Sequence, residues 1–382
     1  MQFDLTSEQR QLQATLQRYL ADQYGFAARQ AAVRSNEGWR REVWSAFASE
    51  LGILGLGVPV AQGGLGGGPV EHMIVMEELG QALALEPYLE TVVIAGRLLS
   101  RAEGSRARDA LAEVTAGRRV FAFAWAEPGM RYAPADIAMT ARRNAEGWRL
   151  DGRKSVVTAA PWADSLIVAA RTGGSPGEPA GLSLFLVDRG SAALTAHDYP
   201  TLDGRRASDL VFEGVMAPAD ALLGGADAAL PIIEEVIDRA IAALSAEAVG
   251  AMRKLHRKVL DYTGQRRQFG QPLSGFQALQ HRMVDMFMQI EMAVSATYLV
   301  TLRLDAPAAE RARAASSAKV TVAKASRFVG QNAVQLHGAM GMTDEFAVGH
   351  HFKRLTMIEA EFGDLDHHLA RHAALSRALA GA

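Results

Sequence analysis

The chain has 382 residues, of which 49% are hydrophobic and 21% charged, and these proportions exclude a disordered, collagen-like or low-complexity protein. Forty basic residues nearly balance 42 acidic ones, so the composition does not indicate a nucleic-acid partner. The absence of cysteine excludes disulfides, thiolate metal ligands and cysteine nucleophiles. The N-terminus lacks a basic start followed by an apolar core, and no apolar run approaches the roughly 20 residues of a membrane span. We therefore expect a cytoplasmic protein without a membrane span.

The N-terminal part of the chain has helical periodicity. Thr6 followed by Gln9 three residues later predicts a capping box, and leucines then recur at helical spacing. Further helices are predicted near residues 39–51 and 70–84. The glycine-rich segment 62–69 between them fits neither a dinucleotide-binding fingerprint nor a Walker pattern, and it is interpreted as a turn that leads into a helix.

The middle of the chain has the pattern of strands. Apolar runs at 120–125, 165–170 and 182–187 have the length of strands, and 148–154 is a further strand with a turn at its Asp-Gly pair. Glycine- and proline-rich stretches separate these runs. They predict a compact antiparallel module, either a barrel or a sandwich.

The C-terminal part is helical again. Four long amphipathic segments are predicted at about 228–263, 275–304, 308–340 and 350–380, and they are expected to pack as a four-helix bundle. The fold class is therefore α+β and multidomain. The predicted domains are an N-terminal helical domain at 1–118, a central β domain at 119–222 and a C-terminal helical bundle at 223–382.

Metal and hydrolase chemistry have little support in the sequence. Histidines occur at 350–351, at 367–368 and at His372, but no HExxH motif is present, and adjacent histidines on a helix point to different faces. No G-x-S-x-G motif is present either. We expect no metal site.

Four motifs carry a family resemblance when they are taken together and in order. They are Trp-Ala-Glu-Pro-Gly at 125–129, Gly-Arg-Lys-Ser-Val-Val-Thr at 152–158, Arg-Arg-Gln-Phe-Gly at 266–270 and Gln-Leu-His-Gly-Ala at 335–339. Each alone is typical of a turn or a helix end. Together they resemble the acyl-CoA dehydrogenase family over essentially the whole chain. The resemblance implies a tetramer of α–β–α subunits that hold FAD and dehydrogenate acyl-CoA thioesters between Cα and Cβ.

The resemblance also assigns residues to the cofactor. The FAD-binding residues that it implies in the β domain are Trp125, Ala126, Arg131, Tyr132, Val156, Val157 and Thr158. Those that it implies at the ADP half of a neighbouring subunit's FAD are Arg266, Gln268, Phe269, Leu273, Phe276 and Gln277. Those that it implies near the adenosine and at the final turn are Gln335, Leu336, Gly338, Ala339, Asp364 and Asp366.

This sequence departs from the family pattern at several of these positions. Ala126 stands where the family has a hydroxyl, Arg131 and Tyr132 stand where it prefers Gly-Ser, and Val156 replaces a tryptophan. The smaller side chain at 156 leaves more room beside the flavin. A bulky or polar acyl group, such as a steroid side chain or a dicarboxylate, is the resulting expectation.

The catalytic base is the least regular feature. The reaction needs a carboxylate to remove the α-proton, but the usual position holds Phe362 and the family's alternative position is near Ala240. Glu247 interrupts an apolar helix and has no basic residue three or four positions away, so burial should raise its pKa toward that of a working base. The small residues on the same helix face, among them Gly250, are expected to leave space for a ligand. Glu247 is the predicted catalytic residue. The alternatives are Glu361, Glu345, a chain without a base, and a Glu247 that reaches solvent or pairs with a distant arginine, such as Arg239 or an arginine of another helix.

The resemblance leaves several functions open. The leading hypothesis is an FAD-dependent acyl-CoA dehydrogenase that passes electrons to electron-transfer flavoprotein. It would work as a homotetramer or as an α2β2 heterotetramer of the kind found in actinobacterial relatives that act on steroid side-chain CoA esters. The alternatives are a non-catalytic or cofactor-sharing subunit of a heteromeric dehydrogenase, and an acyl-CoA oxidase or flavin monooxygenase with the same fold.

Overall fold

A capping box begins the first helix, as the sequence predicts. In the computed structural model, which describes residues 4–380, the Thr6 hydroxyl accepts the Gln9 amide N–H at 3.2 Å. The Gln9 side chain in turn accepts the Thr6 N–H at 3.0 Å, so two otherwise unpaired donors of the first turn are satisfied.

The chain forms two compact units, and each unit combines segments that are not consecutive in the sequence. We call residues 1–31, 69–84 and 241–382 the helical unit, and residues 32–68 and 85–240 the sheet unit. The predicted boundaries at 118 and 222 stay a prediction, because these units group segments by contact and divide the N-terminal helices between them.

The helices are α1 Ser7–Gln23, α2 Phe26–Arg34, α3 Arg41–Ser49, α4 Pro69–Ala82, the π-helix Leu89–Ala95, α5 Gly96–Arg101, α6 Ser105–Thr115, α7 Leu230–Gln265, α8 Gln277–Arg303, α9 Ala308–His337, α10 Ala347–Ala360 and α11 Leu365–Ala380. The predicted helices at 39–51 and 70–84 correspond to α3 and α4. The glycine-rich segment before α4 is a loop that ends in a proline at the first helical position, as predicted.

The sheet unit contains one eight-stranded sheet. Its strands are β1 Phe121–Ala124, β2 Thr140–Asn144, β3 Gly147–Thr158, β4 Ser165–Arg171, β5 Leu182–Asp188, β6 Leu194–Pro200, β7 Arg206–Ala217 and β8 Leu222–Leu223. Their order is β6-β7-β3-β2-β4-β5-β8, with β1 beside β4. The prediction of a purely antiparallel module is wrong for β1 with β4 and for the single bridge between β2 and β4, which are parallel. β4 is buried along its whole length.

Strand β3 is continuous where the sequence predicts a turn. Asp151 and Gly152 lie within the strand, at a shift in its register with β7. Gly152 has φ +150°, and a Cβ there would lie 2.7 Å from Met139, so glycine is needed for the backbone conformation and for the close contact, while the extra residue at this shift is Gly214 of β7. A second register shift lies between Lys154 and Val157.

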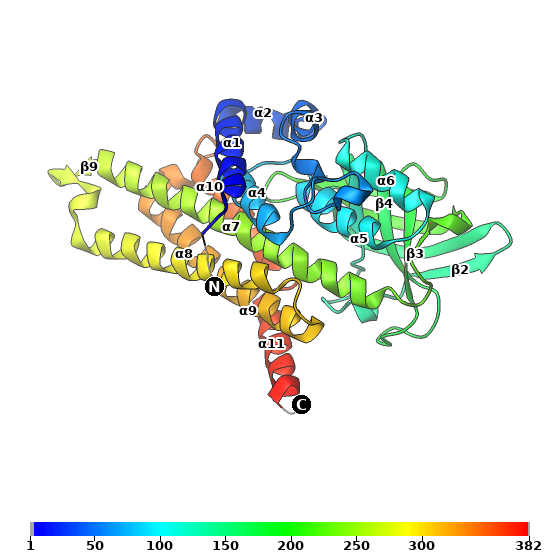
Figure 1. Ribbon diagram of the computed structural model, residues 1–382. Coiled ribbons are helices and arrows are strands. Elements are labelled where there is room, and N and C mark those ends of the chain that lie inside the picture. The colour runs from blue at the N-terminus through cyan, green and yellow to red at the C-terminus, as the bar shows by residue number, and fades with distance from the viewer. Residues whose placement is uncertain (1–3, 381–382) are drawn as a thin grey trace. The chain divides into compact units, whose positions relative to one another are not determined.

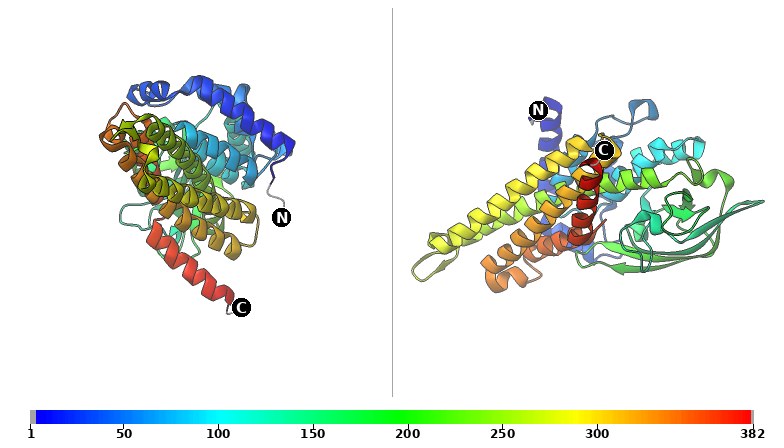
Figure 2. Two further views of the ribbon diagram at one scale, coloured as in Figure 1. Left: turned by 90° about the vertical axis from the view of Figure 1, so that its left-hand side faces the viewer. Right: turned by 90° about the horizontal axis from the view of Figure 1, so that it is seen from below.

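The helical unit contains the long helices α8 and α9, which run side by side (Figure 1). The predicted fourth long segment is instead two helices, α10 and α11, so the four-helix count is wrong within residues 4–380. The break follows from Phe362 at φ +56° and Gly363 at φ +119°, which an α-helix excludes. Between α7 and α8 a short hairpin, β9 Arg267–Gln268 with β10 Gln271–Pro272, projects beyond the helix ends (Figures 1 and 2).

Helices α4 and α7 approach each other backbone to backbone. A Cβ on Gly80 would lie 2.1 Å from the carbonyl oxygen of Glu247, and a Cβ on Gly250 would lie 1.9 Å from that of Glu77. Only glycine permits this distance. The expectation that small residues around Glu247 leave space for a ligand is therefore wrong at Gly250, where α4 fills the space.

By length and composition, α8 is the one helix in the described chain that would suffice to cross a membrane. Core helices often meet the same criterion, and α8 packs along α9. The absence of a membrane span stays a prediction.

Candidate active site

Glu247 meets a cationic partner from another helix. Its two carboxylate oxygens accept hydrogen bonds from Nε and Nη2 of Arg354 on α10, at 2.7 and 2.8 Å. The two side chains are 1% and 3% exposed, so this is a buried, bidentate ion pair. The structure therefore shows the alternative in which Glu247 pairs with an arginine of another helix.

Arg354 also binds the second candidate base. Its Nη1 donates to Glu361 at 2.6 Å, and the Glu361 side chain is 14% exposed. One guanidinium therefore holds two carboxylates, one from α7 and one from the end of α10. We call Glu247, Arg354 and Glu361 the arginine cluster. Glu345, the third candidate, is exposed and lies before α10.

Lys319 fixes the turn that carries Glu361. Its buried ammonium donates to the carbonyl oxygens of Ile358, at 2.7 Å, and of Glu361, which end α10. Burial lowers the pKa of Lys319 to about 8, against the attraction of Glu361. Glu361 is thus held at its carbonyl group by α9 and at its carboxylate by Arg354.

A second buried ion pair lies in the sheet unit. Lys154 donates to Glu127 at 2.7 Å and to the carbonyl oxygen of Trp125 at 3.0 Å, and its side chain is fully buried. The Glu127 carboxylate also accepts the backbone N–H groups of Ala138 and Met139, at 2.8 and 3.0 Å. Burial lowers the pKa of Lys154 to about 8, against the attraction of Glu127.

This pair organises the predicted flavin strands. Trp125 is buried at the end of β1, and the carbonyl oxygen of Ala126 accepts the Ser155 N–H at 2.9 Å. The β3 bulge then presents Val156, which is 55% exposed at φ +51°, a strained conformation for a β-branched residue. Val157 is buried and Thr158 half-buried. The structure therefore brings the residues of the first two motifs together.

Arg131 and Tyr132 lie in the loop after β1. Arg131 is exposed and Tyr132 is half-buried.

The third motif forms the projecting hairpin. Phe269 and Gly270 both have positive φ, at +53° and +81°, as a tight type I′ turn requires. Phe269 is 90% exposed and contacts Phe276 edge to face. The remaining predicted residues are Arg266, Gln268 and Gln277, which are exposed, and Leu273, which is half-buried.

The fourth motif lies beside the end of α7. His337 stacks on Tyr262 with ring centroids 4.5 Å apart, which places the end of α9 next to the helix that leads into the hairpin. Leu336 is buried, whereas Gln335, Gly338 and Ala339 are exposed.

The last two predicted cofactor residues lie at the start of α11. Asp364 accepts the N–H of His367 at 2.8 Å and so caps α11, while Asp366 is exposed. A helix cap is sufficient reason for an aspartate at 364.

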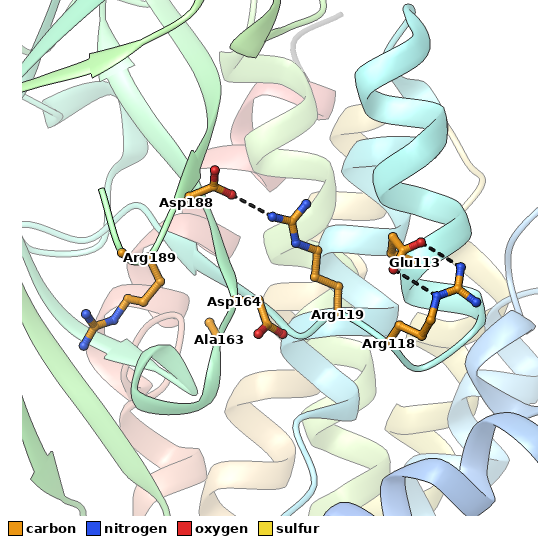
Figure 3. Close-up of a pocket in the computed structure, with 8 residues that line it drawn as sticks. Glu113, Arg118, Arg119, Ala163, Asp164, Asp188 and Arg189 are labelled. Atoms are coloured by element: carbon orange, nitrogen blue, oxygen red, sulfur yellow. Dashed lines mark hydrogen bonds and ion pairs between the residues drawn. The ribbon is translucent and has the colours of Figure 1, made fainter. Parts of the chain in front are cut away.

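An open pocket of about 590 Å³ in the sheet unit contains none of these residues (Figure 3). Figure 3 shows that its charges are largely paired with one another, Arg119 with Asp188 and Arg118 with Glu113, both at 2.7 Å. It is not the candidate site.

Among the described residues, no group of three or more histidine, aspartate or glutamate side chains is arranged to hold a metal ion. His350 and His351 instead bond to backbone carbonyl groups, and His368 bonds to the carbonyl oxygen of Phe362.

Comparisons with known proteins agree with this fold. The acyl-CoA dehydrogenase N-terminal, middle and C-terminal domains match residues 6–102, 122–215 and 230–374. Mitochondrial isovaleryl-CoA dehydrogenase from Pongo abelii is 27% identical over 94% of this chain and 86% of its own. The steroid ACAD Tcur3481–Tcur3483 is 28% identical, with a TM-score of 0.87 over 98% and 99% of the two chains. An FAD complex of PigA has a TM-score of 0.90 at 24% identity, over 100% and 99%, and shows the same fold.

A helical–β–helical chain with these three domains defines a flavoprotein oxidoreductase class. The chain belongs to the acyl-CoA dehydrogenase family.

Sequence reasoning missed Arg354 and Lys319. The available signal was weak: Arg354 stands seven residues before Glu361, a spacing that would place both on one face of a continuous helix, although α10 ends at Ala360. Lys154 and Glu127 lay within the quoted motifs, but their pairing was not predicted.

Proposed function

We propose that this chain is an FAD-dependent acyl-CoA dehydrogenase with Glu247 as its base. The observation that carries the proposal is the buried Glu247 carboxylate held by two hydrogen bonds from Arg354. A neighbouring guanidinium favours the ionised carboxylate, which is the form that accepts a proton. The bidentate contact also fixes the orientation of the carboxylate, as proton transfer requires.

Two exposed apolar surfaces fit the cofactor. Val156 on the β3 bulge offers an uncovered apolar contact suited to a flat ring, and Phe269 on the hairpin offers another. Arg266 and Gln335 supply exposed donors for phosphate and hydroxyl groups. When bound, FAD supplies the acceptor for hydride from the β-carbon. The chain's own residues would position the ring on the strand held by Lys154 and move the α-proton to a Glu247 oxygen.

A second candidate is a cofactor-sharing subunit that does not supply the base. The arginine cluster also supports this candidate. Arg354 donates hydrogen bonds to the carboxylates of both Glu247 and Glu361, so each candidate base is already paired with a cation. The similar steroid ACAD is named for two proteins, Tcur3481 and Tcur3483, and by analogy we propose an α2β2 assembly with a related subunit, with a homotetramer as the alternative.

The substrate class is proposed from the similarity to the steroid ACAD. A bulky CoA ester, such as a steroid side chain, agrees with valine in place of tryptophan at 156. Electron-transfer flavoprotein is the proposed acceptor and the cytoplasm the proposed location. Peroxide release in air would instead indicate the oxidase alternative, and hydroxylated product the monooxygenase.

The test is anaerobic flavin bleaching by a panel of CoA esters, with the chain purified alone and with its partner subunit. We expect Glu247→Gln to keep its flavin and to slow bleaching by about 10³-fold or more, in the range of a lost acid–base group. Glu361→Gln is the matched control, because it removes a carboxylate from the same arginine, and it should stay within about tenfold of wild type. Wild-type bleaching in Glu247→Gln would overturn the assignment, and an equal loss in both variants would favour the second candidate.

A further inference from the structure

A separate pocket lies within the helical unit. It has a volume of about 490 Å³ and is lined by residues of α1, α2, α4, α7 and α10, all of which Figure 1 labels. It contains none of the residues assigned to the cofactor or the base. Its size is in the range of small-molecule sites.

One wall of the pocket is strongly basic. Lys254, Arg257 and Lys258 lie three and four positions apart on α7, so their side chains share one face. Both lysines are half-buried, and within residues 4–380 neither ammonium has a hydrogen-bond or ion-pair partner. Burial lowers the pKa of Lys254, as do the charges of Arg257 and Lys258, while Asp261 acts in the opposite direction. These cations therefore repel one another where an anion would relieve the repulsion.

The acid across the pocket, Glu78, is attracted by Arg257, but among the described residues it forms no ion pair with Lys254 or Lys258. Glu78 on α4 accepts hydrogen bonds from the amides of Gln13, Gln17 and Gln81, at 3.1, 2.8 and 2.8 Å. Burial raises the pKa of Glu78, against these hydrogen bonds. Arg257 donates to the side chain of Gln81. Neutral amides thus satisfy Glu78, and the two lysines stay available to a ligand.

A buried histidine supplies an acceptor at the same pocket. His351 is 2% exposed, and burial lowers its pKa to about 4, so the ring is neutral near pH 7. Its Nδ1 lies 2.8 Å from the carbonyl oxygen of Ala347, whereas Nε2 lies 3.4 Å from that of Gln81. A neutral imidazole carries one hydrogen, and the shorter contact assigns it to Nδ1. Nε2 then faces another acceptor and needs a donor, which a ligand hydroxyl supplies.

The rest of the lining is apolar. Leu20 of α1, Phe26 of α2, Tyr24 between these helices and Leu83 after α4 complete the pocket. We propose that the pocket binds a small organic phosphomonoester, with its phosphate on Lys254 and Lys258, a hydroxyl on His351 and its organic body against Tyr24 and Phe26. Phosphate is favoured over carboxylate because clustered lysines act as point charges that suit a dianion. The inference does not depend on the proposed function.

The test measures binding of AMP and of inorganic phosphate to the FAD-loaded protein by calorimetry. AMP should bind with a Kd below about 1 mM and more tightly than phosphate. The single variants Lys254→Gln and Lys258→Gln should each weaken binding several-fold, and the double variant at least tenfold. Lys324→Gln, an exposed lysine on α9, is the matched control and should bind as wild type does.

Three results would overturn the proposal. They are no AMP binding at 10 mM, about ten times the expected limit; equal AMP binding in the double variant; and phosphate that binds as tightly as AMP. Thermal unfolding of each variant checks that it is folded. If the double variant does not fold, the two single variants still decide the test.

Discussion

The two buried ion-pair sites of this protein are built differently. In the sheet unit, Lys154 and Glu127 bond to each other and to the backbone of Trp125, Ala138 and Met139. In the helical unit, Arg354 holds Glu247 and Glu361 through side-chain contacts. The first pair fixes the course of the backbone, whereas in the second a proton taken up by one carboxylate leaves the arginine paired with the other. We therefore propose that the Lys154–Glu127 pair is structural and that the arginine cluster is where a proton is accepted.

Removing Arg354 should have the largest effect on stability. Arg354→Met leaves two buried carboxylates facing each other, and we expect a loss of about 3–5 kcal/mol in the free energy of unfolding. Chemical denaturation measures it. The double variant Arg354→Met/Glu247→Leu should recover part of the loss. A change below about 1 kcal/mol, the scale of exposed pairs, would mean that the cluster is not buried in solution.

The Lys154–Glu127 pair should make the free energy of unfolding depend on pH in the alkaline range. The pKa of Lys154 is about 8 in the folded protein and ordinarily 10.5, so between these values the unfolded chain holds a proton that the folded chain has released. Stability contributed by this group therefore rises with pH from about 8 to 10.5, by about 3 kcal/mol in total.

Subtracting the curve of Lys154→Met isolates this contribution, because other groups titrate in both proteins. A flat difference between pH 8 and 10.5 would show that Lys154 keeps its ordinary affinity for the proton, and the contrast between the two sites would lose its basis.

The smallest expected effect on stability is at Val156, in the β3 bulge next to Lys154. Val156→Gly should stabilise the protein by about 1 kcal/mol, since glycine adopts φ +51° without the strain of a β-branched side chain and Val156 is mostly exposed. Val157→Gly, at a buried neighbour, is the control and should destabilise it. Stabilisation by Val156→Gly combined with weaker flavin retention would link the strain to cofactor binding.

Local features of the fold could be predicted from the sequence. The Thr6 capping box and the long helices α7, α8 and α9 follow from short-range patterns. β2, β6 and β7 were not predicted, because polar residues, bulges and glycines interrupt their alternation. The break at Phe362 and Gly363 was missed because positive φ at a phenylalanine has no sequence signal.

The candidate residues of the site could be predicted from the sequence, but their partners could not. Glu127 and Lys154 each belong to a motif that the sequence shows, but their pairing across 27 residues was not predicted. Arg354 lies 107 residues from Glu247, and periodicity carries no information about which residue of another helix completes a buried pair. The close approach of α4 at Gly250 was likewise a tertiary feature.

The most direct test of Glu247 as the base is exchange of the substrate α-proton. The FAD-loaded protein, with its partner subunit where one is needed, is incubated in D₂O with a CoA thioester that has no β-hydrogen, and deuterium at the α-carbon is followed by mass spectrometry. We predict exchange in the wild type and in Glu361→Gln, and none above background in Glu247→Gln. Exchange at the wild-type rate in Glu247→Gln would contradict the account.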